Sequence, residues 1–264
     1  MGWAKYQEDI VSRWVNDNYA YRARKAGATP AHRKGTSVPK QEKHMSKLKE
    51  FTMSSARPLP VIVLADVSGS MSANGKIEAL NDAVSEMIAT FTEEDDTRAE
   101  IHVSVIVFGG GGASIHKPLR AARETRWEPM SASGRTPMGE AFELARAMVE
   151  DRGTVPSRAY RPTLVLVSDG VPTDDWRAPL ARLLSSERAS KATRFAMGVG
   201  ADAARETLTA FLANDEGRVF EAHEAREIKN FFRWVTMSVT TRSRSTNPNS
   251  VVMVEPTDLD AFNF

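Results

Sequence analysis

Apolar runs alternate with amphipathic segments along most of the chain, and this alternation limits the fold more than any other feature. The runs predict strands at 61–66, 101–108, 163–168, 195–200 and 219–220, with a short edge strand at 114–118. Apolar residues at helical spacing predict helices at 77–91, 138–149, from 172 onward, at 202–214 and at 228–235. Strands that are apolar at nearly every position are typical of a parallel sheet covered on both faces. We therefore predict an α/β fold with a doubly wound, mostly parallel sheet flanked by helices.

The first of these strands ends in a group of oxygen-bearing side chains. Asp66, Ser68 and Ser70 alternate along the loop that follows the apolar run from Val61. A tight loop can point one carboxylate and two hydroxyl groups toward one place. Hard oxygen ligands without thiol or imidazole suit a small divalent ion such as Mg²⁺. The motif is short and proves little alone, so the rest of the chain must decide its meaning.

Two further segments carry side chains of the same kind. Thr136 lies in the stretch 133–137, just before an amphipathic segment, and Asp169 directly follows the apolar run 163–168. In open α/β sheets the binding crevice lies at the carboxyl ends of strands, where the strand order reverses. Asp66 and Asp169 both follow such strand ends.

Together the three motifs, in this order, resemble the metal-ion-dependent adhesion site (MIDAS) of the von Willebrand factor A domain. The resemblance covers about residues 58–240 and implies a Rossmann-like fold. It implies Mg²⁺, with Mn²⁺ or Ca²⁺ as alternatives, and a protein partner that supplies an Asp or Glu to the metal. It assigns the metal to five residues: Asp66, Ser68, Ser70, Thr136 and Asp169.

Helix capping is an alternative explanation for some of these residues. Ser and Asp are favoured at helix amino termini, so Asp66 and the two serines could cap a helix that begins near Gly75. Asp174 and Asp175 could extend an acidic rim around the site, but a cap for the helix predicted from 172 is the preferred interpretation.

Three neighbouring residues are candidates for contact with the partner. Arg135 would attract an acidic protein, and Met71 and Trp176 would form an apolar rim around the metal. The alternatives are an ordinary solvated arginine and burial of both apolar side chains in the core.

Enzymatic activity is not predicted. Asp66 and Asp169 could form a two-carboxylate magnesium site for phosphoryl transfer, but no phosphate loop or general base accompanies them. The glycines at 109–112 lack a following Gly-Lys-Ser/Thr, and 67–70 is not a nucleophile elbow. The five histidines are scattered without ligand spacing: His32, His44, His102, His116 and His223.

Charge distribution divides the chain into parts. Residues 1–57 carry twelve Lys or Arg against five Asp or Glu, although the whole chain has a net charge of +1. We predict a basic amino-terminal helix and linker at 1–55, the von Willebrand factor A domain at 56–242 and a tail at 243–264. Without cysteine, a secretory signal pattern or a membrane-spanning run, the sequence favours a cytoplasmic location with no membrane contact.

Three further stretches, 168–176, 196–202 and 231–239, are similar to TerY-like proteins of bacterial tellurium-resistance and stress-response clusters. This resemblance implies an intracellular adaptor in a stress-response or phage-defence complex, with a Ser/Thr kinase and a PP2C-type phosphatase as partners. Two features depart from this resemblance: the basic amino-terminal arm is not part of the family's core pattern, and the cysteine-based zinc module that some relatives carry is absent.

Two other functions stay open. The domain could be the adaptor of a MoxR-type AAA ATPase. Alternatively, the Lys and Arg residues of 1–57, interleaved with Trp and Tyr, could contact nucleic acid through phosphates and bases. The apolar and acidic tail at 251–264 could be a last strand or a docking peptide.

Overall fold

The computed structural model of the protein describes residues 56–94, 98–201, 203–213 and 219–250. Within these ranges the strands form one sheet in the order β3-β2-β1-β4-β5-β6. Neighbouring strands are parallel, except that β2 and β3 form an antiparallel pair. The strands are β1 (Arg57–Asp66), β2 (Ala99–Gly109), β3 (Gly112–Ala121), β4 (Thr163–Ser168), β5 (Thr193–Val199) and β6 (Val219–Ala222).

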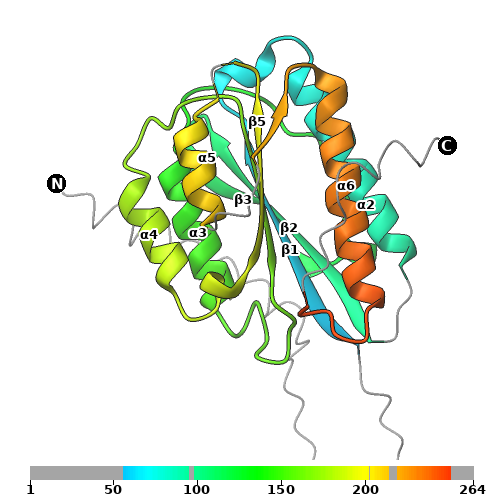
Figure 1. Ribbon diagram of the computed structural model, residues 1–264. Coiled ribbons are helices and arrows are strands. Elements are labelled where there is room, and N and C mark those ends of the chain that lie inside the picture. Colours follow the sequence, from blue (N-terminus) through cyan, green and yellow to red (C-terminus); the bar gives the residue numbers. More distant parts are fainter. Residues whose placement is uncertain (1–55, 95–97, 202, 214–218, 251–264) are drawn as a thin grey trace, which may run out of the picture. The chain divides into compact units, whose positions relative to one another are not determined.

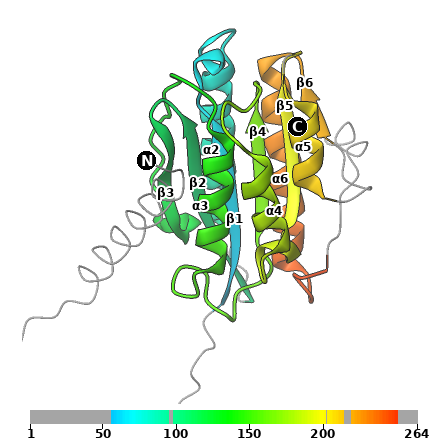
Figure 2. The same ribbon diagram turned by 90° about the vertical axis from the view of Figure 1, so that its left-hand side faces the viewer.

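Helices cover both faces of this sheet. In Figures 1 and 2, α2 (Lys76–Glu93) and α6 (Ala225–Arg244) lie on one face. The other face carries α3 (Met138–Glu150), α4 (Arg177–Ser185) and α5 (Arg205–Leu212). Short 3₁₀ turns complete the described part: η1 (Gly69–Ser72), η2 (Ala122–Glu124) and η3 (Ala189–Lys191). The predicted α/β class, with a doubly wound and mostly parallel sheet, is confirmed.

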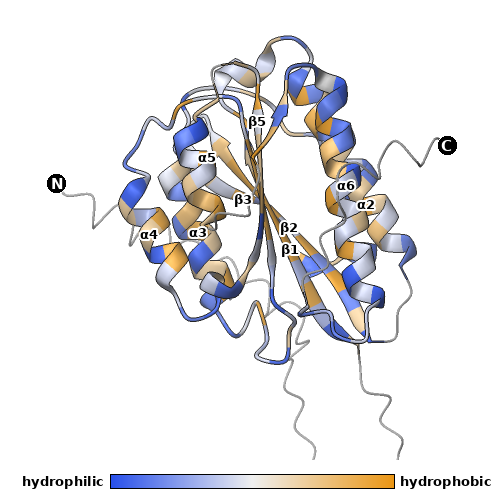
Figure 3. Ribbon diagram, in the orientation of Figure 1, coloured by the Kyte–Doolittle hydropathy of each residue, from blue (hydrophilic) through white to orange (hydrophobic). Residues whose placement is uncertain are grey.

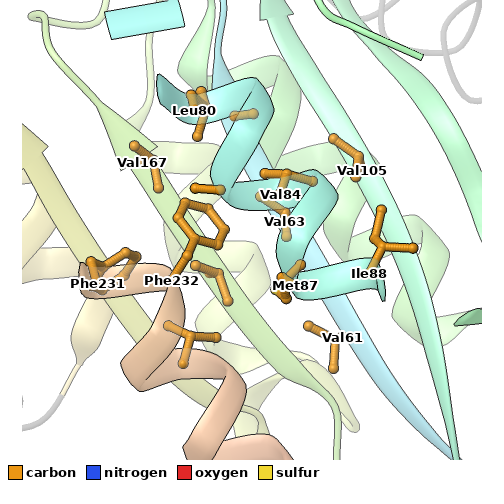
Figure 4. Packing of buried hydrophobic residues seen from close by; sticks show 14 of the residues in the cluster. Val61, Val63, Leu80, Val84, Met87, Ile88, Val105, Val167, Phe231 and Phe232 are labelled. Carbon is orange, nitrogen blue, oxygen red and sulfur yellow. The ribbon is translucent and has the colours of Figure 1, made fainter. Parts of the chain in front are cut away.

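The core lies between the sheet and its helices, as the apolar strands in Figure 3 indicate. Every residue of β1 after Arg57 is buried, and so is every residue of β4. Burial of one large apolar side chain contributes about 1.5–3 kcal/mol. Figure 4 shows such side chains packed together on one face: Leu80, Val84, Met87 and Ile88 of α2, Phe231 and Phe232 of α6, and Val61, Val63, Val105 and Val167 of the central strands.

The strand order determines where a binding crevice can form. From β1 the chain builds outward through β2 and β3 on one side of the sheet, and from β4 through β5 and β6 on the other. The order therefore reverses between the neighbouring strands β1 and β4. Their carboxyl ends, at Asp66 and Ser168, mark the topological switch point of the sheet.

Several element boundaries differ from prediction. The edge strand β3 is longer than 114–118, because Gly112–Ala121 pairs along β2. The last helix, α6, extends on both sides of the predicted apolar stripe. The prediction that a helix starts at 172 is wrong, because α4 begins at Arg177 and the preceding residues contact another loop and helix instead.

Other predictions concern residues that the structure does not describe. The amino-terminal helix and linker at 1–55 and the tail at 251–264 lie outside the described residues, so the domain limits stay predictions. Among the helices of the described part, none combines the length and apolar character needed to cross a membrane.

Candidate metal centre

Asp66, the last residue of β1, is fully buried at the switch point. Its Oδ1 atom accepts a hydrogen bond from the backbone N–H of Ser68 at 2.8 Å, and its Oδ2 atom accepts one from the Ser168 hydroxyl at 2.5 Å. Burial raises the pKa of Asp66, hydrogen bonds from Ser168 and Ser68 oppose this rise, and the charge of Asp169 adds to it. The site thus contains a desolvated carboxylate close to a second one, an arrangement that a cation would stabilise.

Ser68 and Ser70 connect Asp66 to the second carboxylate. The two hydroxyl oxygens lie 3.1 Å apart, and Ser70 donates a hydrogen bond of 2.6 Å to Oδ1 of Asp169. Asp169 directly follows β4, and its side chain is completely buried. Its Oδ2 atom accepts a hydrogen bond of 2.8 Å from Nζ of Lys76, the first residue of α2. The structure therefore brings both carboxylates and both serines together.

Thr136 reaches the same place from the loop before α3. It is buried, its N–H donates to the hydroxyl of Thr173 at 3.1 Å, and its carbonyl accepts from the N–H of Thr173 at 2.9 Å. A methyl group added to Gly170 would lie 3.6 Å from Oγ1 of Thr136 and 3.8 Å from Oγ of Ser70. Both hydroxyls therefore border the space beside Gly170, and all five predicted ligands meet at the switch point.

Glycines hold the Thr136 loop against the Asp66 loop. The N–H of Gly69 donates to the carbonyl of Gly134 at 2.9 Å, and the N–H of Ser133 donates to the carbonyl of Val67 at 2.7 Å. Gly134 has a φ of +72°, and a Cβ atom there would lie 2.6 Å from the Cα atom of Gly110. Gly110 lies in the turn between β2 and β3, and only glycine at position 134 fits against it without strain. The loop that carries Thr136 therefore depends on Gly134.

Helix capping does not explain the first motif. The residue before α2 is Gly75, and no side-chain cap hydrogen bond is present at that helix start. Asp66 and Ser68 form contacts within the site instead. Asp174 does cap a helix, but it is α3 rather than the helix predicted from 172. Its carboxylate accepts the N–H groups of Gly139 at 3.1 Å and Glu140 at 3.0 Å.

The three predicted partner contacts have different environments. Arg135 is exposed, whereas Trp176 is partly buried and the Arg177 guanidinium lies 4.5 Å from its ring centroid. Met71 is fully buried in the hydrophobic core and cannot form an apolar rim. Sequence reasoning missed Val171, which follows the site and is 67% exposed.

A cleft of about 520 Å³ opens beside the site. Its walls include Ser70, Lys76, Asp169, Val171, Gly200 and His223. No signal in the sequence distinguished Lys76 or His223 from ordinary surface residues. The cleft therefore reaches Ser70 and the buried Asp169.

The donor atoms fit a small hard cation. Across the described residues, no cluster of three or more His, Cys, Asp or Glu side chains forms a metal site. The candidate site instead combines two carboxylates with the hydroxyls of Ser68, Ser70 and Thr136. Oxygen donors of this kind suit Mg²⁺ better than a soft transition metal.

Fold and site define a class: a Rossmann-like α/β domain with an oxygen-ligand site at its topological switch point. Residues 61–171 match the family model of the von Willebrand factor type A domain, and this match includes all five predicted ligands. This part of the chain is therefore similar to the von Willebrand factor type A domain. Such domains often act as protein-interaction modules of the MIDAS type.

Solved structures agree on the fold. A von Willebrand factor type A protein from Catenulispora acidiphila is 23% identical at a TM-score of 0.53, over 70% of this chain and 42% of that one. Proximal thread matrix protein 1 from the mussel byssus, with a zinc-occupied MIDAS motif, is 16% identical at a TM-score of 0.51. The match covers 69% of this chain and 48% of that one.

The pilus adhesin SpaC from Lactobacillus rhamnosus GG, in an open conformation, is 15% identical at a TM-score of 0.57, over 70% of this chain and 30% of that one. The chain thus spans less than half the length of each of these three structures. A comparison with curated protein sequences found no match.

Proposed function

We propose that the chain is a Mg²⁺-dependent protein-interaction module and not an enzyme. The observation that carries this proposal is the meeting of two buried carboxylates and three hydroxyls beside an accessible cleft. Asp66, Ser68, Ser70, Thr136 and Asp169 would hold the ion. When bound there, Mg²⁺ supplies a Lewis-acid position for a carboxylate oxygen of the partner. The zinc-occupied MIDAS motif of the mussel protein supports metal binding by a domain of this fold.

The hydrogen bonds that Asp66 and Asp169 accept favour a binding function over a catalytic one. Asp66 accepts hydrogen bonds from Ser68 and Ser168, and Asp169 accepts them from Ser70 and Lys76. Carboxylates held in this way are suited to orienting ligands, whereas a general base needs an accessible oxygen near a substrate proton.

The proposed partner is a protein with an exposed Asp or Glu beside an apolar side chain. The acidic group would approach the metal from the cleft, and the exposed Arg135, next to Thr136 in the chain, would attract it. The apolar group would contact Val171, the large apolar side chain most exposed in the described part of the chain, and the accessible part of Trp176. These contacts would bury apolar side chains next to the carboxylate that binds the metal. Stable interfaces combine a buried apolar core with a few anchoring side chains in the same way.

In the cell, we propose that this module is an intracellular adaptor of a stress-response or phage-defence complex that includes a kinase and a phosphatase. The similarity of 168–176, 196–202 and 231–239 to TerY-like proteins supports this role. The cytoplasmic location, coupling to an AAA ATPase, and nucleic-acid contact through the basic arm stay predictions.

Calorimetric titration of Mg²⁺ tests the site directly. We expect the wild type to bind one Mg²⁺ and Ser70→Ala to bind at least about tenfold more weakly, because one ligand oxygen is lost. Asp82→Ala is the matched control, since Asp82 is exposed on α2 and pairs with Lys229. The proposed site is wrong if the wild type binds no divalent ion, or if Ser70→Ala and Asp82→Ala bind equally well.

A further inference from the structure

Lys76 carries a positive charge into the candidate metal centre. Its Nζ atom lies 2.8 Å from Oδ2 of Asp169, whose side chain is completely buried, and the lysine side chain itself is only 19% exposed. The ion pair therefore differs from a solvent-exposed surface pair, which contributes little to stability. Lys76 neutralises part of the negative charge that Asp66 and Asp169 place at the switch point.

Lys76 occupies a helix position that is unfavourable for a positive charge. It is the first residue of α2, where the helix dipole favours negative rather than positive side chains. A Cβ atom on Gly200 would lie 3.6 Å from Nζ of Lys76, so the glycine leaves room for the ammonium at the end of β5. The contact with Asp169 compensates for the unfavourable helix position. The ammonium is thus held by the site and not by its own helix.

We propose that Lys76 is a built-in competitor of the divalent ion and limits its affinity for the site. This inference rests on the proposed metal site. A cation held by Asp169 shares a ligand with the ammonium and is repelled by its charge. Metal binding therefore weakens the Lys76–Asp169 contact. The released ammonium would remain at the cleft that Lys76 already lines, where it can meet an acidic partner.

Titration of Mg²⁺ into Lys76→Met tests the competition, because methionine keeps most of the side-chain volume and removes the charge. We expect the dissociation constant of Mg²⁺ to fall about tenfold in Lys76→Met. Lys76→Arg keeps the charge and should stay within about threefold of the wild type. Lys229→Met is the control, because Lys229 on α6 pairs with Asp82 outside the site.

The outcomes separate this inference from the proposed function. If the wild type binds Mg²⁺ and Lys76→Met binds it equally or more weakly, competition by Lys76 is wrong and the metal site stands. If neither protein binds a divalent ion, the metal site itself is wrong and the inference fails with it. Tighter binding in Lys76→Met alone supports competition.

A second measurement on the wild type does not depend on the folding of a variant. Lysine acylation followed by peptide mapping compares Lys76 with Lys229 in the presence and absence of Mg²⁺ at a concentration that saturates the site by calorimetry. We expect the acylation rate of Lys76 to rise severalfold with Mg²⁺ and that of Lys229 to stay constant. An unchanged rate at Lys76 under saturation would overturn the proposed competition.

Discussion

Asp66 and Asp169 are the residues where binding and stability conflict. Both are buried, and each raises the electrostatic cost of the other's charge. Hydroxyl donors and Lys76 offset part of this cost, but a core optimised for stability alone would not contain two buried carboxylates. Their burial side by side supports the proposed metal site, because a cation would offset the charge of both.

Gly134 provides a residue-scale test of how the site is assembled. In Gly134→Ala, a Cβ atom would lie 2.6 Å from Cα of Gly110 at a φ of +72°, so the Thr136 loop must move. We expect a loss of about 1–3 kcal/mol in the free energy of unfolding, measured by urea denaturation, and weaker Mg²⁺ binding.

Gly111→Ala is the matched control for this test, because a Cβ atom at Gly111 would meet nothing within 4 Å. Its stability should remain within about 0.5 kcal/mol of the wild type. If Gly134→Ala and Gly111→Ala had equal stability and equal affinity for Mg²⁺, the close contact between Gly134 and Gly110 would not be needed to hold the site together.

Much of the site could be predicted at this scale because the ligands directly follow recognisable strands or precede a recognisable helix. Lys76 could not be predicted as part of the site, because a lysine at a helix start has the same sequence appearance as a solvated one. The sequence position of Met71 was compatible both with an apolar rim around the metal and with burial in the core. The turn η1 directs its side chain into the core. The local sequence pattern identifies the residues that can bind a metal. Which other side chains surround the site depends on tertiary packing.

At the scale of elements, the loop before α4 holds α3 in place. The carboxylate of Asp174 accepts the N–H groups of Gly139 and Glu140 in the first turn of α3, so one loop caps the helix that follows another. Asp174→Ala removes this cap and should lower the free energy of unfolding by about 1 kcal/mol at neutral pH. Asp175→Ala, in the same loop, should have a smaller effect, because the Asp175 carboxylate accepts the N–H of Arg177 rather than an N–H of α3.

The same cap has a predictable pH dependence. Burial raises the pKa of Asp174, and hydrogen bonds from Gly139 and Glu140 oppose the rise. Because the folded pKa exceeds the unfolded one, the contribution of Asp174 to stability is greatest below the unfolded pKa and falls as the pH rises through the folded pKa. The stability advantage of the wild type over Asp174→Asn should therefore be larger near pH 4 than near pH 7. Denaturant titrations at both pH values would contradict this if the advantage grew with pH.

The strands and helices could be predicted where apolar residues form a continuous run or recur at helical spacing. β4 has the predicted bounds 163–168, since all of its residues are apolar or small and buried. The start of α4 was not predictable, because polar residues such as Thr173 and Asp174 suit a helix start but contact the Thr136 loop and α3 here. Side chains that bond to distant backbone groups have no local signature.

For the whole domain, the reversal of strand order between β1 and β4 is what joins the parts of the site. Residues as distant in sequence as Asp66 and Asp169 become neighbours because each follows the carboxyl end of a central strand. The alternation of strands and helices predicted a doubly wound sheet, but strand order depends on packing across the entire domain. The match to the von Willebrand factor type A family over 61–171 agrees with this arrangement.

The most direct test of metal-dependent partner binding is capture of partners by the tagged full chain from cells that express it naturally, with Mg²⁺ or with EDTA. Asp66→Ala is compared with the exposed-site control Asp82→Ala. We predict one dominant partner that the wild type and Asp82→Ala retain in Mg²⁺ and that is lost on chelation and in Asp66→Ala. A partner that persists both in EDTA and on Asp66→Ala would contradict the proposed function.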